Sequence, residues 1–313
     1  MIVFLMIALR NHMITVSDYL KNKYGCKVYK LSLQTGCTCP NRDGSKGTGG
    51  CIFCSEGGSG DFAAPLLSID EQIELAKKRV DDKFPKGTSD RRYIAYFQSF
   101  TNTYGSVDEL EPMFVKALSY DEIVGISIAT RPDCLPDDIM DMLIRLNAVK
   151  PVWVELGLQT SSEETARLIN RCYTLREFED GYRKLKENGI YTVIHMIAGL
   201  PGENEEMILN TARYIGSLNP VPDGIKIQLM HVLRGTKLAQ MYEDRPFPLP
   251  TLEEYCDIVG KILDILPDDI TVHRLTGDGP KRILIAPLWS ADKKKVINTM
   301  RSALTVSDPQ QGS

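Results

Sequence analysis

Short apolar runs alternate with helical patterns along the 313 residues, and this alternation limits the fold more than any other feature. Six of the runs are rich in β-branched and aromatic residues. Several are apolar at successive positions, as in parallel strands covered on both faces. They span residues 27–33, 93–97, 123–129, 152–158, 191–199 and 224–230. A seventh run, 270–275, is expected to add a strand or to seal an edge.

The helical patterns between the runs open with capping boxes, in which a Ser or Thr hydroxyl accepts from a backbone N–H and a Glu three residues later reaches back. These pairs are Ser68/Glu71, Ser106/Glu109, Ser161/Glu164, Thr174/Glu177 and Thr251/Glu254. Six strand–helix units in series predict an α/β fold with a parallel sheet and right-handed crossovers. We expect a partial (β/α)6 barrel of the TIM type with a small C-terminal extension, because the count of units stops near six.

Polar residues gather where the predicted strands end, which is where barrels of this type place their chemistry. We therefore expect the functional site at the C-terminal edge of the sheet. The residues are Gln98, Thr130, Arg131, Glu155, Gln159 and His231.

The length suits one α/β barrel with short extensions. We expect an N-terminal extension over residues 1–24, the barrel over 25–240, a C-terminal extension closing the barrel over 241–304, and a disordered tail over 305–313. The opening MIVFLMIAL lacks the basic leader and cleavage site of a signal peptide, and it is shorter than the roughly 20 residues that span a bilayer. We expect a cytoplasmic protein with no membrane partner, whose thiols stay reduced.

The net charge of −4 argues against binding nucleic acid through bulk charge. Basic runs at 77–79, 91–92, 281–282 and 293–295 allow a local basic face. Runs of this kind are usually solvated surface, so they do not by themselves indicate RNA binding.

Half of the eight cysteines lie in CTCPNRDGSKGTGGCIFC, residues 37–54. A reducing cytoplasm disfavours disulfides. Four-cysteine zinc sites usually have two C-x-x-C knuckles, whereas the first pair here is C-x-C, and zinc stays the alternative. A 4Fe–4S cluster on Cys39, Cys51 and Cys54 fits the spacing better, because an iron without a protein thiolate can bind a substrate or cofactor. Cys37 is then the odd thiol.

This loop resembles a lengthened form of the three-cysteine motif of the radical S-adenosylmethionine superfamily, with Phe53 as the aromatic before the last cysteine. Further motifs follow in that superfamily's order: SIATRPD (127–133), VELGLQ (154–159), INR (169–171) and HMIAGLPG (195–202). They are especially similar to the radical domain of the Elongator catalytic subunit, and more distantly to oxygen-independent coproporphyrinogen oxidase. A bacterial subgroup with CPNRDG (39–44), TRPDC (130–134) and HR…APLW (273–274, 286–289) is most similar; the resemblance covers roughly residues 25 to 290.

The resemblance implies an enzyme that reductively cleaves S-adenosylmethionine at a 4Fe–4S cluster to a 5′-deoxyadenosyl radical. An external flavodoxin- or ferredoxin-type donor would supply the electron. The matching cluster ligands are Cys39, Cys51 and Cys54. The matching or neighbouring cofactor contacts are Phe53, Gln98, Thr101, Asn102, Gln159, Arg171, His195 and Gly199, and the candidate catalytic residues are Glu155 and His195.

Two positions depart from the resemblance. Ala129 stands where related enzymes often carry an acidic residue, and Cys172-Tyr173 follows Arg171 where they often have Gly-His. Contacts to the cofactor ribose or to the substrate are expected to differ there.

The Elongator-like motifs imply a tRNA substrate modified at C5 of the wobble uridine. This sequence carries no acetyltransferase domain, so we expect a different change, such as trimming or altering an aminomethyl-type group. One alternative is a radical step in small-molecule cofactor or porphyrin-like biosynthesis, which predicts a closed pocket in place of an open basic mouth. Another is a zinc- or cluster-stabilised RNA-binding protein without turnover.

Overall fold

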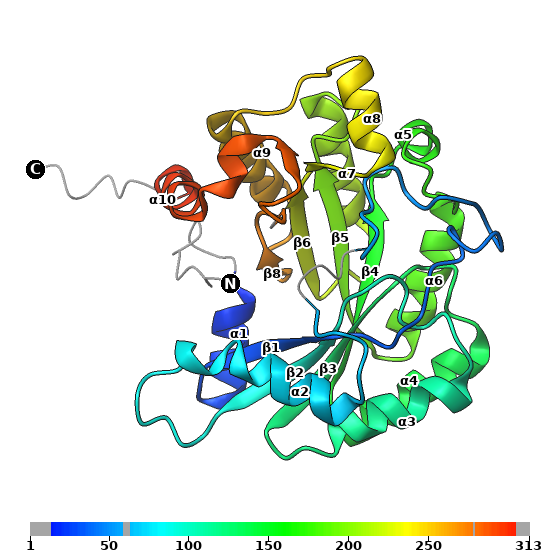
Figure 1. Cartoon of the computed structure of the whole chain (residues 1–313), viewed down its shortest axis with the longest axis vertical. Coiled ribbons are helices and arrows are strands. Elements are labelled where there is room, and N and C mark those ends of the chain that lie inside the picture. Colours follow the sequence, from blue (N-terminus) through cyan, green and yellow to red (C-terminus); the bar gives the residue numbers. More distant parts are fainter. Residues whose placement is uncertain (1–13, 59–62, 278, 305–313) are drawn as a thin grey trace, which may run out of the picture.

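The computed structural model describes residues 14–58, 63–277 and 279–304, and its core is a curled sheet of seven parallel strands (Figure 1). The strands follow the order β1-β2-β3-β4-β5-β6-β8. Their bounds are β1 (Val28–Leu33), β2 (Arg92–Phe97), β3 (Ile123–Thr130), β4 (Val152–Gln159), β5 (Tyr191–Ala198), β6 (Gly224–Leu229) and β8 (Thr271–Arg274). The predicted α/β partial barrel is confirmed, and the seventh run adds a strand because β8 pairs in parallel with β6.

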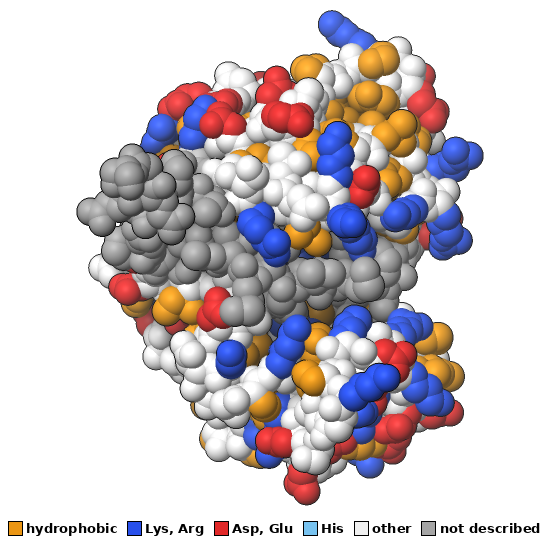
Figure 2. All heavy atoms as spheres, turned by 90° about the vertical axis from the view of Figure 1, so that its left-hand side faces the viewer, with side chains coloured by type: hydrophobic (Ala, Val, Ile, Leu, Met, Phe, Trp, Pro, Cys, Tyr) orange, Lys and Arg blue, Asp and Glu red, His pale blue; other side chains and the backbone are white. Residues whose placement is uncertain are grey.

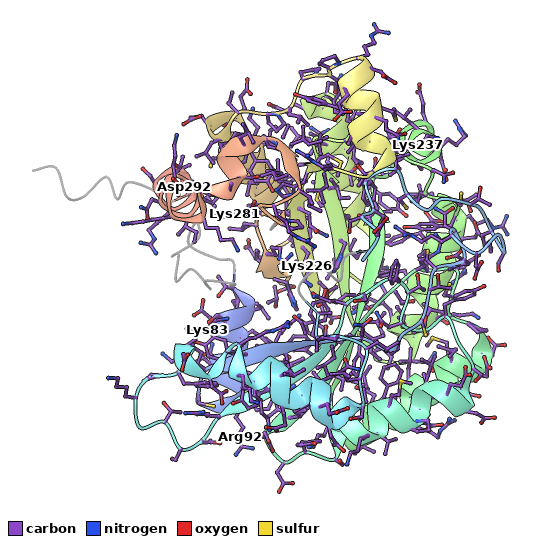
Figure 3. All side chains as sticks on the ribbon, viewed as in Figure 1. Lys83, Arg92, Lys226, Lys237, Lys281 and Asp292 are labelled. Atoms are coloured by element: carbon purple, nitrogen blue, oxygen red, sulfur yellow. The ribbon has the colours of Figure 1, made fainter. Side chains whose placement is uncertain are left out.

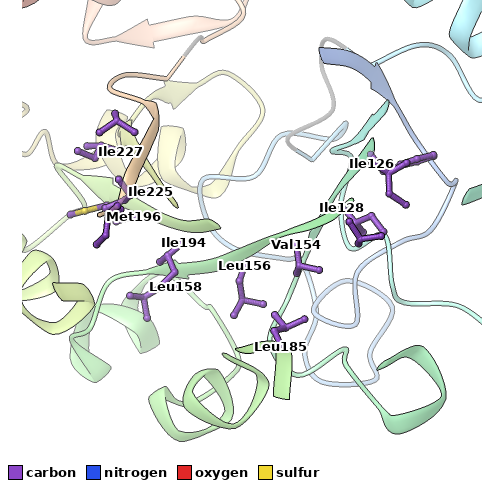
Figure 4. Close-up of a cluster of buried hydrophobic side chains, with 14 of the residues drawn as sticks. Ile126, Ile128, Val154, Leu156, Leu158, Leu185, Ile194, Met196, Ile225 and Ile227 are labelled. Carbon is purple, nitrogen blue, oxygen red and sulfur yellow. The ribbon is translucent and has the colours of Figure 1, made fainter. Parts of the chain in front are cut away.

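Helices cover the convex side of the sheet (Figure 1). They pack on alternate strand residues that are buried and apolar, such as Ile126, Val154 and Leu156 (Figure 4). This two-sided burial explains why the strands read as nearly continuous apolar runs. The covering helices are α2 (Ile69–Lys78), α3 (Val107–Leu118), α4 (Asp137–Val149), α6 (Leu175–Glu187), α7 (Glu205–Ser217) and α9 (Leu252–Ile265).

Most of the predicted helix starts are correct. Complete capping boxes form at Ser68, Thr174 and Thr251, and Ser106 caps α3 through its hydroxyl. The prediction at Ser161 is wrong: Ser162 caps α5 (Glu163–Leu168) by accepting from the backbone N–H of Thr165 at 3.2 Å. Ser161 is instead held by α7, since its N–H donates to the Thr211 hydroxyl at 3.1 Å.

The N-terminal ends of the strands are closed by α1 (Val16–Tyr24). Val16 and Leu20 are buried against the first residues of several strands, including Val28 and Trp153. Trp153 also stacks on Tyr191 at 4.8 Å between ring centroids. This apolar plug leaves the C-terminal ends of the strands as the open end of the half-barrel.

The C-terminal segments pack beside the open end. A two-stranded antiparallel sheet joins β7 (Val232–Leu233) to β9 (Leu284–Ala286). Around it lie α8 (Lys237–Asp244) and the short helix η2 (Leu288–Ala291), while α10 (Lys293–Leu304) packs on α9. The predicted domain boundaries stay a prediction, and the predicted disordered tail 305–313 lies outside the described residues. None of the described helices is both long and apolar enough to cross a membrane.

The packing of the convex side makes a prediction for stability. Leu156 is fully buried, so Leu156→Ala should lower the free energy of unfolding by about 2–5 kcal/mol, through lost burial and the cavity it leaves. The matched change Leu168→Ala removes a side chain that is 44% exposed, and should stay within about 0.5 kcal/mol of the parent. Urea unfolding curves measure both; equal effects would contradict the assignment of β4's faces.

Candidate functional site

A cavity of ≈ 690 Å³ occupies the concave side of the sheet and reaches the cysteine loop. Nine of the twelve predicted site residues line it, and the structure does not bring Asn102, Arg171 or Gly199 to it. The nine are Cys39, Cys51, Phe53, Cys54, Gln98, Thr101, Glu155, Gln159 and His195. The sequence motifs therefore converge on one place, although each comes from a different strand or loop.

The cysteine loop is a cradle whose shape depends on glycine. Gly49 and Gly50 have φ values of 78° and 77°, in the left-handed region that favours glycine. A Cβ added at Gly50 would lie 2.9 Å from Arg42 Nε, so a side chain there would displace Arg42. That arginine fastens the loop, because its guanidinium donates to the carbonyls of Ser55 at 2.6 Å and Cys54 at 3.3 Å.

Cys37 faces away from this cradle. Its side chain packs against the hydrophobic core and does not line the cavity. The loop thus offers three cysteines to the cavity and holds the fourth in the core.

The three thiols on this loop are those that the sequence predicts as cluster ligands. Among the described residues, no three His, Cys, Asp or Glu side chains are placed to hold one metal ion. A cuboidal cluster asks for a different arrangement, because each thiolate binds its own iron. The side-chain amide of Asn41 donates toward Cys51 Sγ at 3.8 Å, a contact of the kind that tunes cluster sulfur.

Arg131 of the TRPDC motif joins the loop to the sheet. Its guanidinium makes a two-point ion pair with Asp133, at 2.9 and 2.7 Å. It also donates to the carbonyl of Arg171 at 3.0 Å and lies 4.0 Å from Cys39 Sγ. The bond to Asp133 keeps the pKa of Arg131 above its usual value despite the burial that would lower it, so a permanent positive charge stands beside the first cysteine.

Arg171 is buried behind the cavity wall, with 1% of its surface exposed. Its guanidinium donates to the carbonyls of Leu158, Thr160 and Tyr173, at 2.7 to 3.1 Å. It also lies against the ring of Tyr173, which does line the cavity. In this arrangement Arg171 holds the end of β4 and positions Tyr173, the residue that departs from the related motif.

The other two residues outside the cavity also have structural contacts. The amide of Asn102 is fully buried and bridges β2, β3 and the segment before the cysteines, because it donates to the carbonyls of Phe97 and Ala129 and accepts from the Thr35 hydroxyl. Gly199 ends β5 with a φ of 90°, and an added Cβ would lie 3.3 Å from Pro250.

Four residues other than glycine have a left-handed backbone, and two of them, Phe100 and Gln159, line the cavity. Phe100, Gln159, Asn170 and Cys172 all have φ between 53° and 68°. Such conformations cost free energy and tend to persist at functional sites. The Gln159 side-chain oxygen is buried and has no hydrogen-bond partner in the described part of the chain. An acceptor of this kind suits a hydroxyl of a bound cofactor.

Glu155 lies in the middle of β4, on the floor of the cavity, and not at the end of its strand as the sequence indicated. It is 1% exposed and has four partners. Oε1 accepts from Lys30 at 2.6 Å and Ser127 at 2.7 Å, while Oε2 accepts from His195 at 2.9 Å and from Lys226.

Burial and the neighbouring lysines shift the pKa values of Glu155 and His195. Burial would raise the pKa of Glu155, but the charges of Lys226 and Lys30 overcome it and hold the pKa well below its usual value. Burial and the charge of Lys226 lower the pKa of His195 to about 4. His195 is therefore neutral at pH 7; its Nε2 donates to Glu155 and its Nδ1 faces the Gln228 amide at 3.4 Å.

The sequence analysis did not predict the basic residues on the floor of the cavity as site residues. Lys30, Lys226 and Arg274 line the cavity together with Tyr96, whose hydroxyl accepts from Lys226 at 3.1 Å. A usable signal was present, since Lys226 is the only charged residue within the apolar run GIKIQLM. A charge in such a run must point to a partner or to a cavity.

A glycine-rich loop that presents three cysteines to the mouth of a parallel half-barrel defines an iron–sulfur barrel enzyme. The chain belongs to the radical SAM superfamily: the model of that family matches residues 33–215, and the model of the Radical SAM C-terminal domain matches residues 222–305. A 4Fe–4S cluster and S-adenosylmethionine are the cofactors of this family. Family membership removes the hypothesis of an RNA-binding protein without turnover.

Known proteins agree with this assignment. YtqA of Bacillus subtilis (strain 168) is 43% identical over 299 residues, covering 95% of this chain and 91% of its own. A tRNA uridine(34) acetyltransferase of Methanocaldococcus infernus is 27% identical over 164 residues, which are 52% of this chain and 30% of that protein. The structure of Methanocaldococcus infernus Elp3 with an N-terminal deletion has the same fold, with a TM-score of 0.65 at 17% identity, over 89% of this chain and 64% of that one.

The arrangement of the cysteines predicts different outcomes for two neighbouring substitutions. Cys39→Ala removes a thiol that lines the cavity and should abolish cluster assembly, whereas Cys37→Ala removes a thiol packed in the core and should leave the cluster intact. Anaerobic reconstitution followed by iron and sulfide analysis measures both. Loss of the cluster in Cys37→Ala with retention in Cys39→Ala would mean that the wrong first ligand was assigned.

The environment of His195 predicts that it stays neutral down to about pH 4, compared with 6.5 for an unperturbed histidine. Burial and the charge of Lys226 both oppose protonation. ¹⁵N spectra of cluster-free protein with labelled histidine measure this. The signal of His195 is identified by its absence from the spectrum of His195→Gln, and it should not titrate between pH 8 and 5. Because the unfolded chain takes up this proton first, the free energy of unfolding should fall as pH decreases from 6.5 toward 4. A titration midpoint near pH 6.5 for the His195 signal, the value of an unperturbed histidine, would contradict the packing of His195 against Glu155 and Lys226.

Proposed function

We propose that this radical SAM enzyme remodels the C5 side chain of the wobble uridine in tRNA, for example by trimming or altering an aminomethyl-type group. The observation that carries the proposal is a pair of lysines that we call the rim lysines: Lys83 lines the cavity, and Lys27 lies beside it, over the ring of the lining residue Tyr29. One relative of this chain bears the name tRNA uridine(34) acetyltransferase, which supports a nucleoside of that kind as substrate.

The rim lysines come from distant parts of the chain. Lys83, in the short helix η1 (Asp81–Lys83), lines the cavity, and its pKa is lowered by burial and by the positive charges of Lys27 and Lys293. The ammonium groups of Lys27 and Lys83 stand 5.0 and 6.0 Å from the centre of the Tyr29 ring. Neither has an acidic partner in the described ranges.

Lysine and arginine side chains gather along the facing edges of the upper and lower parts of the molecule (Figure 2). Lys83 lies on the lower part of the molecule and Lys281 on the upper part, and Lys226 lies deeper, on the concave side of the sheet (Figure 3). Lysines that repel one another are stabilised when a polyanion binds, and RNA phosphates are the polyanion that this proposal requires. The chain thus combines a net charge of −4 with a local basic face.

The residues of the cavity have different roles in the proposed reaction. When bound, the cluster and S-adenosylmethionine supply a carbon-centred radical that takes hydrogen from the substrate. Cys39, Cys51 and Cys54 would hold the cluster, with Phe53 and Gln159 beside the cofactor. Glu155 orients neutral His195 from below. The buried floor and the α1 plug exclude water from the reacting carbon.

We place the reaction in the cytoplasm, where thiols stay reduced, with a flavodoxin- or ferredoxin-type protein as electron donor. A small-molecule substrate is the second candidate function. It is favoured by the size of the cavity, because ≈ 690 Å³ lies in the range that encloses such ligands.

Nucleoside profiling tests the proposal. In a strain lacking the gene, mass spectrometry of tRNA hydrolysates should show a wobble uridine with an unprocessed C5 side chain. Complementation with the parent gene should restore the product, and Cys39→Ala should not. Purified enzyme should form 5′-deoxyadenosine with the mutant strain's tRNA and a reductant. An unchanged nucleoside profile would refute the tRNA proposal and favour the small-molecule candidate.

The rim makes a separate prediction for affinity. The double variant Lys27→Glu/Lys83→Glu should weaken binding of tRNA and lower the slope of log affinity against log salt by about 1 for each phosphate that the rim no longer binds. The control Lys237→Glu changes an exposed lysine on α8, which does not line the cavity, and should bind like the parent. Filter binding at several salt concentrations distinguishes them. Equal salt slopes for the double variant and the control would remove the rim from the RNA interface.

A further inference from the structure

We propose that the floor of the cavity contains an anion subsite, in which Arg274 and Lys226 bind a carboxylate or phosphate group of the substrate. The inference rests on the proposed function in one respect, since it takes the ligand to be the enzyme's substrate. It adds that this substrate carries a negative charge close to the carbon that reacts.

The subsite lies on three neighbouring strands of the sheet. His195 pairs in register with Lys226 between β5 and β6, and Lys226 pairs with Arg274 between β6 and β8. All three side chains line the cavity, so they form a row across its floor. The row begins beside Glu155 and ends at β8, an outer strand of the sheet.

In the described part of the chain, the unpaired side chain in this row is that of Arg274. It is half-buried and lines the cavity, yet within residues 14–58, 63–277 and 279–304 its guanidinium has neither a hydrogen bond nor an ion pair. Its five N–H donors face the cavity without a partner among the described residues, so they are available to a ligand. The planar fork of arginine suits the two oxygens of a carboxylate or phosphate.

The charges of the cavity favour an anion. Among the described residues that line it, Glu155 is the only carboxylate, and that carboxylate is already saturated by four partners. The basic lining residues are Lys30, Arg42, Arg79, Lys83, Arg131, Lys226 and Arg274. Of these, Lys30 is paired with Glu155 and Arg131 with Asp133, whereas Arg274 has no acidic partner among the described residues. Lys226 donates to Glu155 and Tyr96, and burial lowers its pKa well below the ordinary value of a lysine, so Arg274 carries the positive charge of the subsite.

We assign the subsite to the substrate and not to the carboxylate of S-adenosylmethionine. Arg42 and Arg131 already stand at the cysteine loop, where they contact Ser55 and Cys39. Arg274 lies on β8, at the other end of the strand order from β1, the strand that leads into that loop. A substrate anion held there would place its neighbouring C–H groups between the basic floor and the cofactor.

Isothermal titration of the reconstituted enzyme saturated with S-adenosylmethionine tests the subsite. The probes are acetate, inorganic phosphate and the neutral acetamide, at constant ionic strength. At least one anion should bind tenfold or more tightly than acetamide. Tighter binding of acetate identifies a carboxylate as the source, and tighter binding of phosphate identifies a phosphate.

Arg274→Gln should weaken binding of the preferred anion by about tenfold to a hundredfold, the value of a charge-assisted hydrogen bond, and Arg274→Lys should recover part of it. The matched control Arg282→Gln changes an exposed arginine of the same segment that does not line the cavity, and should bind like the parent. Anions that bind no better than acetamide, or equal affinities for Arg274→Gln and Arg282→Gln, would overturn the proposal.

This result is separable from that of the tRNA proposal. A cavity that fails to bind either anion while the nucleoside profile changes would reject only the subsite. An unchanged nucleoside profile with intact anion binding would reject only the tRNA substrate.

Discussion

The half-barrel is built around one buried carboxylate. Glu155 on β4 binds side chains from β1, β3, β5 and β6, so a single charge ties five strands together on the concave side of the sheet. A buried charge without partners is strongly destabilising, and all four partners are therefore needed. Most barrel interiors are packed with apolar layers, whereas this interior is ionic and leaves a cavity.

The ionic floor divides the molecule into surfaces with different roles. The convex side of the sheet is apolar and packs the helices, and α1 seals the N-terminal ends of the strands. The C-terminal ends carry the cysteine loop, which follows β1 there. The apolar packing keeps the strands in register, and that register brings the cysteines, Gln159 and the basic row of β5, β6 and β8 to one cavity.

Strand periodicity and capping residues were sufficient to predict the partial barrel, because runs such as 152–158 and boxes such as Thr251/Glu254 are local signals. That Cys39, Cys51 and Cys54 meet at the cavity was predictable from the local motif of the loop, and their role as cluster ligands stays a prediction. The positions of Arg171 and Glu155 were not: a motif gives the residue, but only the register decides whether a guanidinium reaches the cavity or binds carbonyls behind it. Arg274 was missed because its environment depends on β8 joining a sheet whose other strands are far away in sequence.

The central claim is that hydrogen leaves a tRNA nucleoside inside this cavity. It can be measured directly by isolating tRNA from the mutant strain grown in deuterated medium and treating it with purified enzyme, reductant and unlabelled S-adenosylmethionine. The 5′-deoxyadenosine formed should contain one deuterium taken from the tRNA. If it contains none while the tRNA keeps its full label, the substrate is not the wobble uridine, and the claim is contradicted.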